Sequence, residues 1–366
     1  MIHFNTTDFI EKLFSWFQQN KRDLPWRQTY TPYHVWISEM MLQQTQMERG
    51  VDYFNKWIEK YKNPTDIANA SLEDILQSWE GLGYYSRARN IHKTAQILRD
   101  TYQGTIPCDE KIIAKLPGIG DYTLCAIMGI AFEKDFATID ANVERVFARI
   151  FNLTDKNLKK ACFPLVNKLL PKGQARIYNQ ALMELGALVC KKNPQCSLCP
   201  LTSFCMAKKL NLENERPLPK EKKAYVPILA SFVIIQTKEQ NIFICQRTNQ
   251  KLWHNMWEFY GIDNIFFDPN IKANSKEQEH IAKQSIIQEL TKILSITEKD
   301  IQLEAKAIHI TSTYTNHKLS AFFFIWKVNQ EQKQQIQKNI KGIFVTNSQE
   351  YAMASHHRKA SLKLNL

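Results

Sequence analysis

Residues 190–205, CKKNPQCSLCPLTSFC, decide how the rest of this 366-residue chain is interpreted, because they gather four cysteines in one short, polar segment. The four are Cys190, Cys196, Cys199 and Cys205. Thiolates this close in sequence would repel one another unless a metal centre neutralised them. Pro194 and Pro200 favour turns that aim the sulfurs at one point. The segment therefore predicts a metal-cluster loop.

Two kinds of metal centre take four thiolates, a zinc ion and an iron–sulfur cluster. Zinc sites usually pair two short knuckles, whereas here only Cys196 and Cys199 form one. We therefore favour a [4Fe-4S] cluster, with zinc as the alternative. Four unrelated buried thiols fit poorly, because the sequence between the cysteines is polar and rich in turn formers.

Composition restricts the class of protein. The apolar content of 44% argues against disorder, and the length allows two domains with cores of their own. No signal peptide is evident, and no apolar run is long enough to span a bilayer. The other cysteines lack regular spacing, so we expect a reducing compartment and no membrane contact; they are Cys108, Cys125, Cys162 and Cys245.

The formal net charge is +12, and it is uneven along the chain. Residues 155–224 carry 14 Lys and Arg against 5 Asp and Glu, a local net charge of +9. A basic band beside a cluster loop suits a phosphate backbone better than a small metabolite, although a solvated basic face is the simpler alternative.

The first 210 residues are patterned as helices. Asp8 precedes an apolar set at helical spacing, and a second series recurs at intervals of three and four. The first set is Phe9, Leu13, Trp16 and Phe17, and the second is Ala88, Ile91, Ala95 and Leu98. Residues 211–224 turn polar and contain Pro217, Pro219 and a Lys-rich run, which predicts a linker.

The remaining residues, 225–366, predict a small α+β domain. Strands are expected at residues 228–236, 242–247 and 319–328, where β-branched and aromatic side chains gather. One helix is expected, at residues 280–294. The chain is thus predicted to have an all-α domain at 1–210, a linker at 211–224 and an α+β domain at 225–366.

Within the helical part, residues 116–120 (LPGIG) resemble the hairpin of a helix-hairpin-helix DNA-binding motif. Gly118 and Gly120 let the backbone turn tightly, and the N–H groups that open the next helix can point at a phosphate oxygen. Such a turn is a weak signal alone. Its context strengthens it, because Asp140 follows in residues 138–146 (TIDANVERV), ahead of the four cysteines.

A hairpin, an aspartate and a four-cysteine loop, in this order, resemble the helix-hairpin-helix DNA glycosylases of the endonuclease III type. The resemblance narrows to the MutY-type adenine DNA glycosylases through residues 36–46 (WISEMMLQQTQ), 24–27 (LPWR) and 81–85 (GLGYY). It is supported by Tyr122, where lyase relatives carry a catalytic lysine, and by the extra C-terminal domain.

The resemblance implies that Glu39 protonates the N7 atom of adenine and that Asp140 stabilises the cation that forms on the sugar or bonds to it transiently. The same two roles follow from the chemistry, because cleaving a glycosidic bond needs an acid for the leaving group and negative charge near the oxocarbenium ion. The pKa of Glu39 would then have to rise by about two units from about 4.3, through burial among side chains such as Ile37, Met40 and Met41. Tyr122 and Asn142 join the catalytic set.

For each carboxylate a simpler interpretation exists. Glu39 could be a surface charge on an amphipathic helix, and Asp140 could be a helix N-cap placed before Val143.

The resemblance also implies the DNA contacts. Gln44 and Tyr84 would fill the gap left by a flipped nucleotide, braced by Leu42. Trp26, Arg27 and Glu184 would line the adenine pocket. Glu184 lies in residues 182–186 (LMELG), where an acid needs a base or an arginine to meet it. The hairpin glycines Gly118 and Gly120 would hold the phosphate backbone.

The C-terminal domain resembles a Nudix fold without hydrolase chemistry. A magnesium-binding helix needs several acids, whereas residues 287–292 (IQELTK) hold only Glu289. In the family, this domain recognises 8-oxoguanine through a loop that we match to Tyr314, Thr315 and Asn316. The family's histidine is replaced by Asn316, so either Asn316 or the adjacent His317 makes the contact.

These features together predict a monofunctional, monomeric adenine DNA glycosylase that acts on double-stranded DNA with A:8-oxoguanine or A:G mismatches, in the bacterial cytoplasm near the nucleoid. Two alternatives stay open. A bifunctional glycosylase and lyase would need an amine nucleophile in place of Tyr122, and a non-enzymatic iron–sulfur protein would bind DNA without removing adenine.

Overall fold

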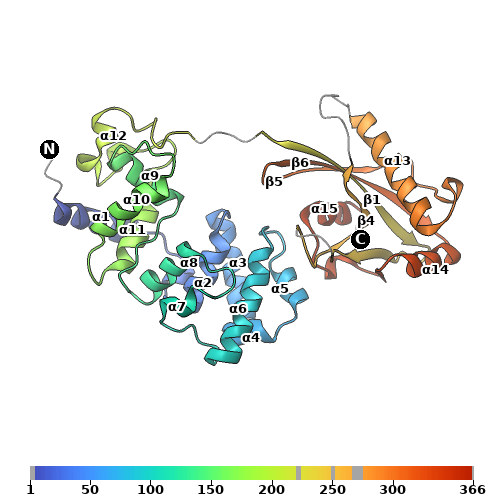
Figure 1. Ribbon diagram of the computed structural model, residues 1–366, viewed down its shortest axis with the longest axis horizontal. Helices are drawn as coiled ribbons and strands as arrows, with labels where there is room; N and C mark the ends of the chain where they lie inside the picture. Colours follow the sequence, from blue (N-terminus) through green and yellow to red (C-terminus); the bar gives the residue numbers. More distant parts are fainter. Residues whose placement is uncertain (1–4, 220–223, 249–251, 266–274, 365–366) are drawn as a thin grey trace. The chain divides into compact units, whose positions relative to one another are not determined.

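The computed structural model describes residues 5–219, 224–248, 252–265 and 275–364 (Figure 1). The chain forms two compact units. The first consists of Met1–Ser71 and Ser86–Glu221, and the second of Leu72–Tyr85 and Lys222–Leu366. The second unit thus takes in a short segment from the helical half of the sequence. The domain boundaries at 210 and 224 stay a prediction.

The first unit is helical, as the sequence predicts. Its α-helices are α1 (Thr6–Asn20), α2 (Pro32–Leu42), α3 (Met47–Lys60), α4 (Pro64–Asn69), α6 (Ser86–Tyr102), α7 (Glu110–Ile113), α8 (Asp121–Ala126), α9 (Ala141–Ile150), α10 (Leu158–Leu169), α11 (Ala175–Leu188) and α12 (Met206–Lys209). Shorter turns of helix are η1 (Pro25–Arg27), the π-helical η2 (Ile127–Ala131), η3 (Cys196–Leu198) and η4 (Thr202–Phe204).

The two helical series of the sequence lie in α1 and α6. In α1 the buried residues are Phe9, Leu13 and Phe17, which pack with α9, α10 and α11 into one core. The helix begins earlier than Asp8, because the side chain of Asn5 accepts the N–H groups of Thr7 and Asp8. Asp8 instead pairs with Lys12 one turn later.

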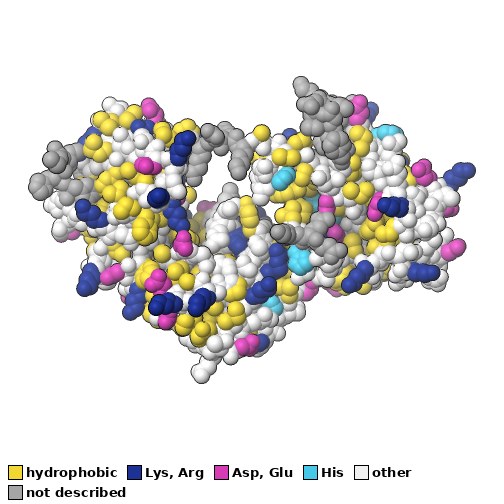
Figure 2. Space-filling view, viewed as in Figure 1, with side chains coloured by type: hydrophobic (Ala, Val, Ile, Leu, Met, Phe, Trp, Pro, Cys, Tyr) yellow, Lys and Arg dark blue, Asp and Glu magenta, His cyan; other side chains and the backbone are white. Residues whose placement is uncertain are grey.

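Figure 2 shows Lys and Arg side chains scattered over one face of the helical unit, with Asp and Glu among them. Among the described residues, none of the helices combines the length and the apolar character needed to cross a membrane.

The second unit is built on a sheet with strand order β3-β2-β1-β6-β5, in which β4 also pairs with β1 and β7 with β2. The strands are β1 (Val226–Thr237), β2 (Ile242–Gln246), β3 (Trp257–Glu258), β4 (Tyr260–Ile265), β5 (Ile308–Tyr314), β6 (His317–Val328) and β7 (Ile343–Val345). The helices are α5 (Leu72–Ser78), α13 (Ser275–Leu294), α14 (Gln330–Asn339) and α15 (Ser355–Lys363), with η5 (Glu298–Asp300) and η6 (Ser348–Glu350).

The long strands β1 and β6 run parallel in the middle of this sheet, and both of its faces are buried. Leu229, Val233 and Ile235 of β1 face one core with α13 and α14, while Ala230, Phe232 and Ile234 face a second core with α15. This alternation is the period of two expected of a strand. The predicted strands and the helix at 280–294 all form, as parts of β1, β2, β6 and α13.

The expectation of one helix in the C-terminal half was incomplete, because α14 and α15 also form there. Both are short, and each buries only a few apolar side chains, such as Ile336 and Ala360. Their apolar stripes are therefore too narrow to stand out as a periodic pattern.

Candidate active site

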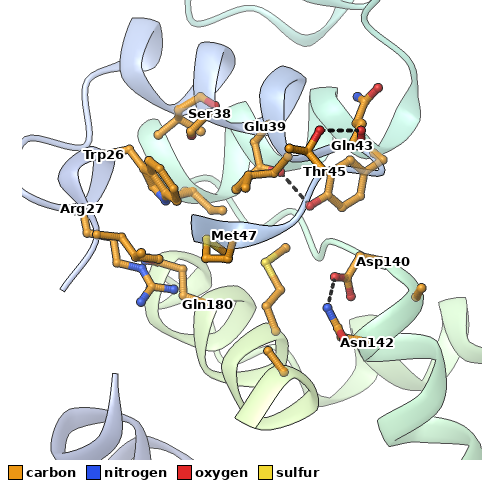
Figure 3. Close-up of a pocket in the computed structure, with 18 of the residues that line it drawn as sticks. Trp26, Arg27, Ser38, Glu39, Gln43, Thr45, Met47, Asp140, Asn142 and Gln180 are labelled. Atoms are coloured by element: carbon orange, nitrogen blue, oxygen red, sulfur yellow. Dashed lines mark hydrogen bonds between the residues drawn. The ribbon is translucent and has the colours of Figure 1, made fainter. Parts of the chain in front are cut away.

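A pocket of about 590 Å³ opens in the helical unit, between α2, α8, α11 and the start of α9 (Figure 3). It brings together eight of the residues that the sequence nominates. Those residues are Trp26, Arg27, Glu39, Leu42, Gln44, Tyr122, Asp140 and Asn142. In Figure 3 Glu39 reaches down from α2 at the top, Asp140 lies at the lower right, and Trp26 and Arg27 lie at the left.

Glu39 is buried, with 8% of its surface exposed, on a helix whose residues from Val35 to Met41 are all buried. The interpretation as a surface charge is therefore wrong. Burial raises the pKa of Glu39 to about 7, because an ionised carboxylate is poorly solvated there. A hydrogen bond from Tyr122 and the charge of Arg27 oppose this rise, whereas the charge of Asp140 adds to it.

Tyr122 reaches Glu39 because the hairpin sets the start of α8. Gly118 has φ +78°, and a Cβ there would lie 2.6 Å from the Cβ of Asn90, so only glycine fits. Gly120 is the N-cap residue, and Tyr122 follows in the first turn. Its hydroxyl donates a 2.6 Å hydrogen bond to Oε2 of Glu39. Burial raises the pKa of Tyr122 well above 10, so the phenol stays protonated and acts as a donor.

Asp140 is the N-cap of α9, as the simpler interpretation of this residue predicts, and its catalytic role stays a prediction. Its Oδ1 accepts the N–H of Val143 at 2.7 Å, and its Oδ2 accepts Nδ2 of Asn142 at 2.8 Å. Burial raises the pKa of Asp140, while these hydrogen bonds and the charge of Arg145 hold it down. The two bonds fix the carboxylate in one orientation at the pocket wall.

The hydrogen bonds continue from Asp140 towards the cysteine loop. Arg145 donates from Nη2 to Oδ1 of Asn142 at 2.8 Å and from Nε to the carbonyl of Cys190 at 2.7 Å. The approach of α9 to α11 depends on Gly186, whose added Cβ would lie 2.5 Å from the Cβ of Asn142.

Glu184 departs from the prediction, because it is not among the residues that line the pocket. It is almost fully buried and forms ion pairs with Nη2 of Arg22 at 2.7 Å and Nη1 of Arg27 at 2.5 Å. The prediction that this buried acid needs an arginine partner is therefore met by two arginines. Glu184 holds Arg22 and Arg27, and these two line the pocket in its place.

The end of α2 and the turn after it carry the two remaining predicted residues of this region, Leu42 and Gln44. Gln44 is exposed and has φ +58°, a backbone conformation that residues other than glycine rarely adopt. Nη1 of the buried Arg87 holds the turn, donating to the carbonyls of Met40 at 2.7 Å and Gln43 at 2.6 Å. The side chain of Leu42 packs against Gly50 of α3.

Tyr84 lies in the second unit, in the turn that follows α5. It is 47% exposed and has φ +47°, between a left-handed Gly83 and the buried Tyr85. Tyr84 is thus a large, half-exposed aromatic side chain on a strained turn.

The four predicted cysteines line one small cavity next to Arg149. The guanidinium of Arg149 is buried, and its Nη1 donates to Sγ of Cys190 at 3.2 Å. Among the described residues, no group of three or more His, Cys, Asp or Glu side chains is close enough to hold one metal ion.

In the second unit, the predicted lesion loop is a tight hairpin between β5 and β6. Tyr314 pairs with His317 across it, their rings stack at 5.3 Å, and Thr315 has φ +49°. Nδ1 of His317 lies 3.1 Å from Oγ1 of Thr315. The carbonyl of Asn316 accepts the N–H of Val226 at 2.8 Å, which ties the hairpin to β1.

Glu289, the one acid of residues 287–292, accepts a hydrogen bond from the hydroxyl of Tyr260 at 3.1 Å. Its carboxylate is engaged within the domain.

Several pocket residues were missed by the sequence reasoning. They are Arg22, Ser38, Gln43, Thr45, Met47, Gln180 and Met183. Three of them, Ser38, Gln43 and Thr45, lie inside the segment 36–46 but were given no role. Gln180 precedes Glu184 by one helical turn, a spacing that could have pointed to it.

Comparisons with known proteins find relatives among DNA-repair proteins. Residues 37–172 match the HhH-GPD superfamily of base excision DNA repair proteins. A solved thermostable thymine-DNA glycosylase is 30% identical, with a TM-score of 0.52, and covers 56% of this chain and 97% of its own.

Two adenine DNA glycosylases are more similar in sequence to this chain than the thymine-DNA glycosylase is. The one from Buchnera aphidicola subsp. Schizaphis graminum is 34% identical over 284 residues, 76% of this chain and 79% of its own length. The one from Rattus norvegicus is 39% identical over 217 residues, 56% of this chain and 42% of its own. With the four-cysteine loop, the hairpin and the Glu39 pocket in the positions described, the chain belongs to the adenine DNA glycosylase family.

Proposed function

We propose that this protein is a monofunctional DNA glycosylase that hydrolyses the N-glycosidic bond of adenine mispaired with 8-oxoguanine or guanine, and so begins base-excision repair. The observation that carries the proposal is the pair formed by Glu39 and Tyr122 in a pocket that Asp140 also lines. The pocket supplies both the acid and the anion that the reaction needs.

The first step is protonation of the leaving base. A carboxyl with a pKa near 7 is substantially protonated at neutral pH and gives up its proton readily. Glu39 donates that proton to N7 of adenine, which turns the base into a better leaving group. Tyr122 orients the carboxyl through its hydrogen bond.

The second step is loss of the base and capture of the sugar by water. As the glycosidic bond breaks, positive charge develops on the deoxyribose, and the carboxylate of Asp140 stabilises it. Asn142 and the N–H of Val143 hold this carboxylate in place. Water then adds to the sugar carbon and leaves an abasic site.

Base removal without strand cleavage is supported by the character of the pocket. A lyase forms a Schiff base with a lysine amine, and no lysine is among the described residues that line the pocket. Tyr122 stands at the position expected of that amine, and its phenol stays protonated.

The substrate enters as a nucleotide flipped out of double-stranded DNA, since its base cannot be reached within the stack. Trp26 offers an aromatic wall beside Arg27, which Glu184 holds. Gln44 and Tyr84 would fill the vacated space, and the turn at Gly118 and Gly120 would hold a phosphate.

The Nudix-like second domain is proposed to read 8-oxoguanine through the hairpin of Tyr314, Thr315 and Asn316, with His317 as the other candidate. The partly exposed side chains at this turn are suited to a base edge. The cysteines at 190, 196, 199 and 205 are proposed to hold a [4Fe-4S] cluster, which stabilises the fold of the loop when bound.

The direct test uses the purified protein with three duplexes, which carry adenine opposite 8-oxoguanine, guanine or thymine. Hot alkali then cleaves any abasic site. Cleavage at adenine, fastest opposite 8-oxoguanine, is expected. Binding to the duplexes without cleavage would favour a non-enzymatic DNA-binding protein, and a covalent adduct trapped by borohydride would favour a lyase.

A further inference from the structure

Residues Leu72–Tyr85 belong to the second compact unit, although α4 and α6 of the first unit flank them in sequence. Two glutamates attach this segment to residues near the C-terminus. Glu73 in α5 accepts the N–H of Ala352 at 2.9 Å through Oε1 and Nε1 of Trp257 at 3.1 Å through Oε2. Both carboxylate oxygens of Glu73 are therefore engaged.

The second glutamate, Glu80, forms a two-pronged ion pair with Arg358 in α15. Nε donates to Oε1 at 2.5 Å and Nη2 to Oε2 at 2.8 Å, and the side chains are only 18% and 15% exposed. Arg358 is itself fixed by the carbonyls of Ser348 at 3.1 Å and Tyr351 at 2.6 Å. Planar, partly buried pairs of this kind impose geometry as well as attraction.

Glu80 directly precedes the turn that carries Tyr84. Gly81 and Gly83 have φ of +97° and +72°, and the indole of the buried Trp79 donates to the carbonyl of Gly83 at 3.0 Å. The turn is thus rigid at its base, and the ion pair of Glu80 fixes the residue from which it starts.

Arg358 lies in a helix that also supports the hairpin of residues 314–317. Helix α15 packs against β5, the strand that ends at Tyr314. The ring of His356 lies 4.7 Å from that of Trp253, and Trp253 lies 5.0 Å from Tyr314. The Tyr84 turn and this hairpin are therefore held by one helix.

We propose that Glu80 and Arg358 are positioning residues that hold the Tyr84 turn against the rest of the second unit, which reads the base opposite adenine. The inference rests on the proposed function. Because the pair links the two DNA-contacting turns, insertion of Tyr84 follows engagement of the lesion, and the preference for 8-oxoguanine over guanine depends on the pair.

The test compares Glu80→Ala, Arg358→Ala, the double variant and the charge swap E80R/R358E in the full-length protein. Single-turnover rates are measured on duplexes with adenine opposite 8-oxoguanine or guanine. In parallel, 2-aminopurine beside the target adenine reports how far Tyr84 disturbs the stack. The matched control is Glu304→Gln, which removes one charge from an exposed pair with Lys327 in the same unit.

Each single variant is expected to lower the ratio of the two rates by about tenfold and to reduce the fluorescence change towards that of Tyr84→Ala. The double variant should be no worse than either single one, the swap should recover part of the loss, and Glu304→Gln should behave as the wild type.

The inference is overturned if the variants keep the wild-type rate ratio and fluorescence change, or if both rates fall equally with no rescue by the swap. The latter result would mean a role in stability alone. Failure of the proposed function looks different, because the wild-type protein itself would then remove no adenine.

Discussion

The hydroxyl of Tyr122 lies 2.6 Å from Oε2 of Glu39 and donates a hydrogen bond to it, although 83 residues separate the two in sequence. The bond favours the ionised carboxylate, whereas burial and the charge of Asp140 favour the protonated one. Burial has the larger effect, and the pKa of Glu39 rises to about 7. A carboxyl balanced in this way can exchange a proton at neutral pH.

Glu39→Gln should abolish adenine removal and leave duplex binding intact, because the amide keeps the shape of the side chain but has no proton to give. Single-turnover assays and a binding titration measure the two properties separately. Glu59→Gln, an exposed glutamate on α3, is the matched control and should cleave normally. Excision by Glu39→Gln at the wild-type rate would remove Glu39 from the mechanism.

The rate of base removal should fall as the pH rises through about 7, since only protonated Glu39 can act as the acid. Tyr122→Phe removes a bond that lowers the pKa of Glu39, so the falling limb should move to higher pH by about one unit. Rates between pH 5.5 and 9 test this, with Tyr102→Phe, outside the pocket, as the control. An unmoved limb would show that the tyrosine does not tune the acid.

Asp140→Asn should slow base removal by about a hundredfold or more while DNA binding persists, because the lost charge acts mainly in the transition state. Asparagine is also a good N-cap, so α9 should stay intact. Asp109→Asn makes the same change at the N-cap of α7, outside the pocket, and should leave the rate unaltered. Equal losses in the two variants would point to helix capping rather than to catalysis.

The purified protein should be brown and contain about four irons per chain. Cys199→Ser should lower the iron content and the soluble yield and weaken DNA affinity, without changing which base is removed. Iron analysis and visible absorbance provide the measurement, and the exposed Cys108→Ser is the control. A colourless protein with one zinc per chain would refute the cluster.

Asn316→Ala and His317→Ala should separate the two candidates for contact with 8-oxoguanine. Loss of a buried hydrogen bond is worth about 1–3 kcal/mol, enough to change the preference over guanine by about tenfold. The ratio of the two single-turnover rates identifies the reading side chain, against Asn339→Ala, an exposed asparagine on α14. If both variants keep the full preference, the hairpin does not read the lesion.

Local patterns in the sequence were enough to predict the helices, strands and turns that depend on residues close together in the chain. The apolar spacing predicted α1 and α6, the glycines at 118 and 120 predicted the hairpin, and β-branched runs predicted β1 and β6. Each of these depends on a period of 3.6 or 2, or on a backbone angle that only glycine adopts readily. The same reasoning noted Asp8 ahead of the first apolar residue of α1, whereas the helix is capped by Asn5, three residues earlier.

The sequence by itself determined which residue types are present and in what order: a glutamate in a buried helix, an aspartate before another, and four cysteines in one loop. Only the tertiary structure decided their surroundings. It brought Tyr122 to Glu39, turned Glu184 towards Arg22 and Arg27 instead of the pocket, and attached Glu80 to Arg358. Such pairs depend on packing between elements far apart in the chain, which no local periodicity encodes. The same packing excludes water from Glu39, and this loss of solvation raises its pKa.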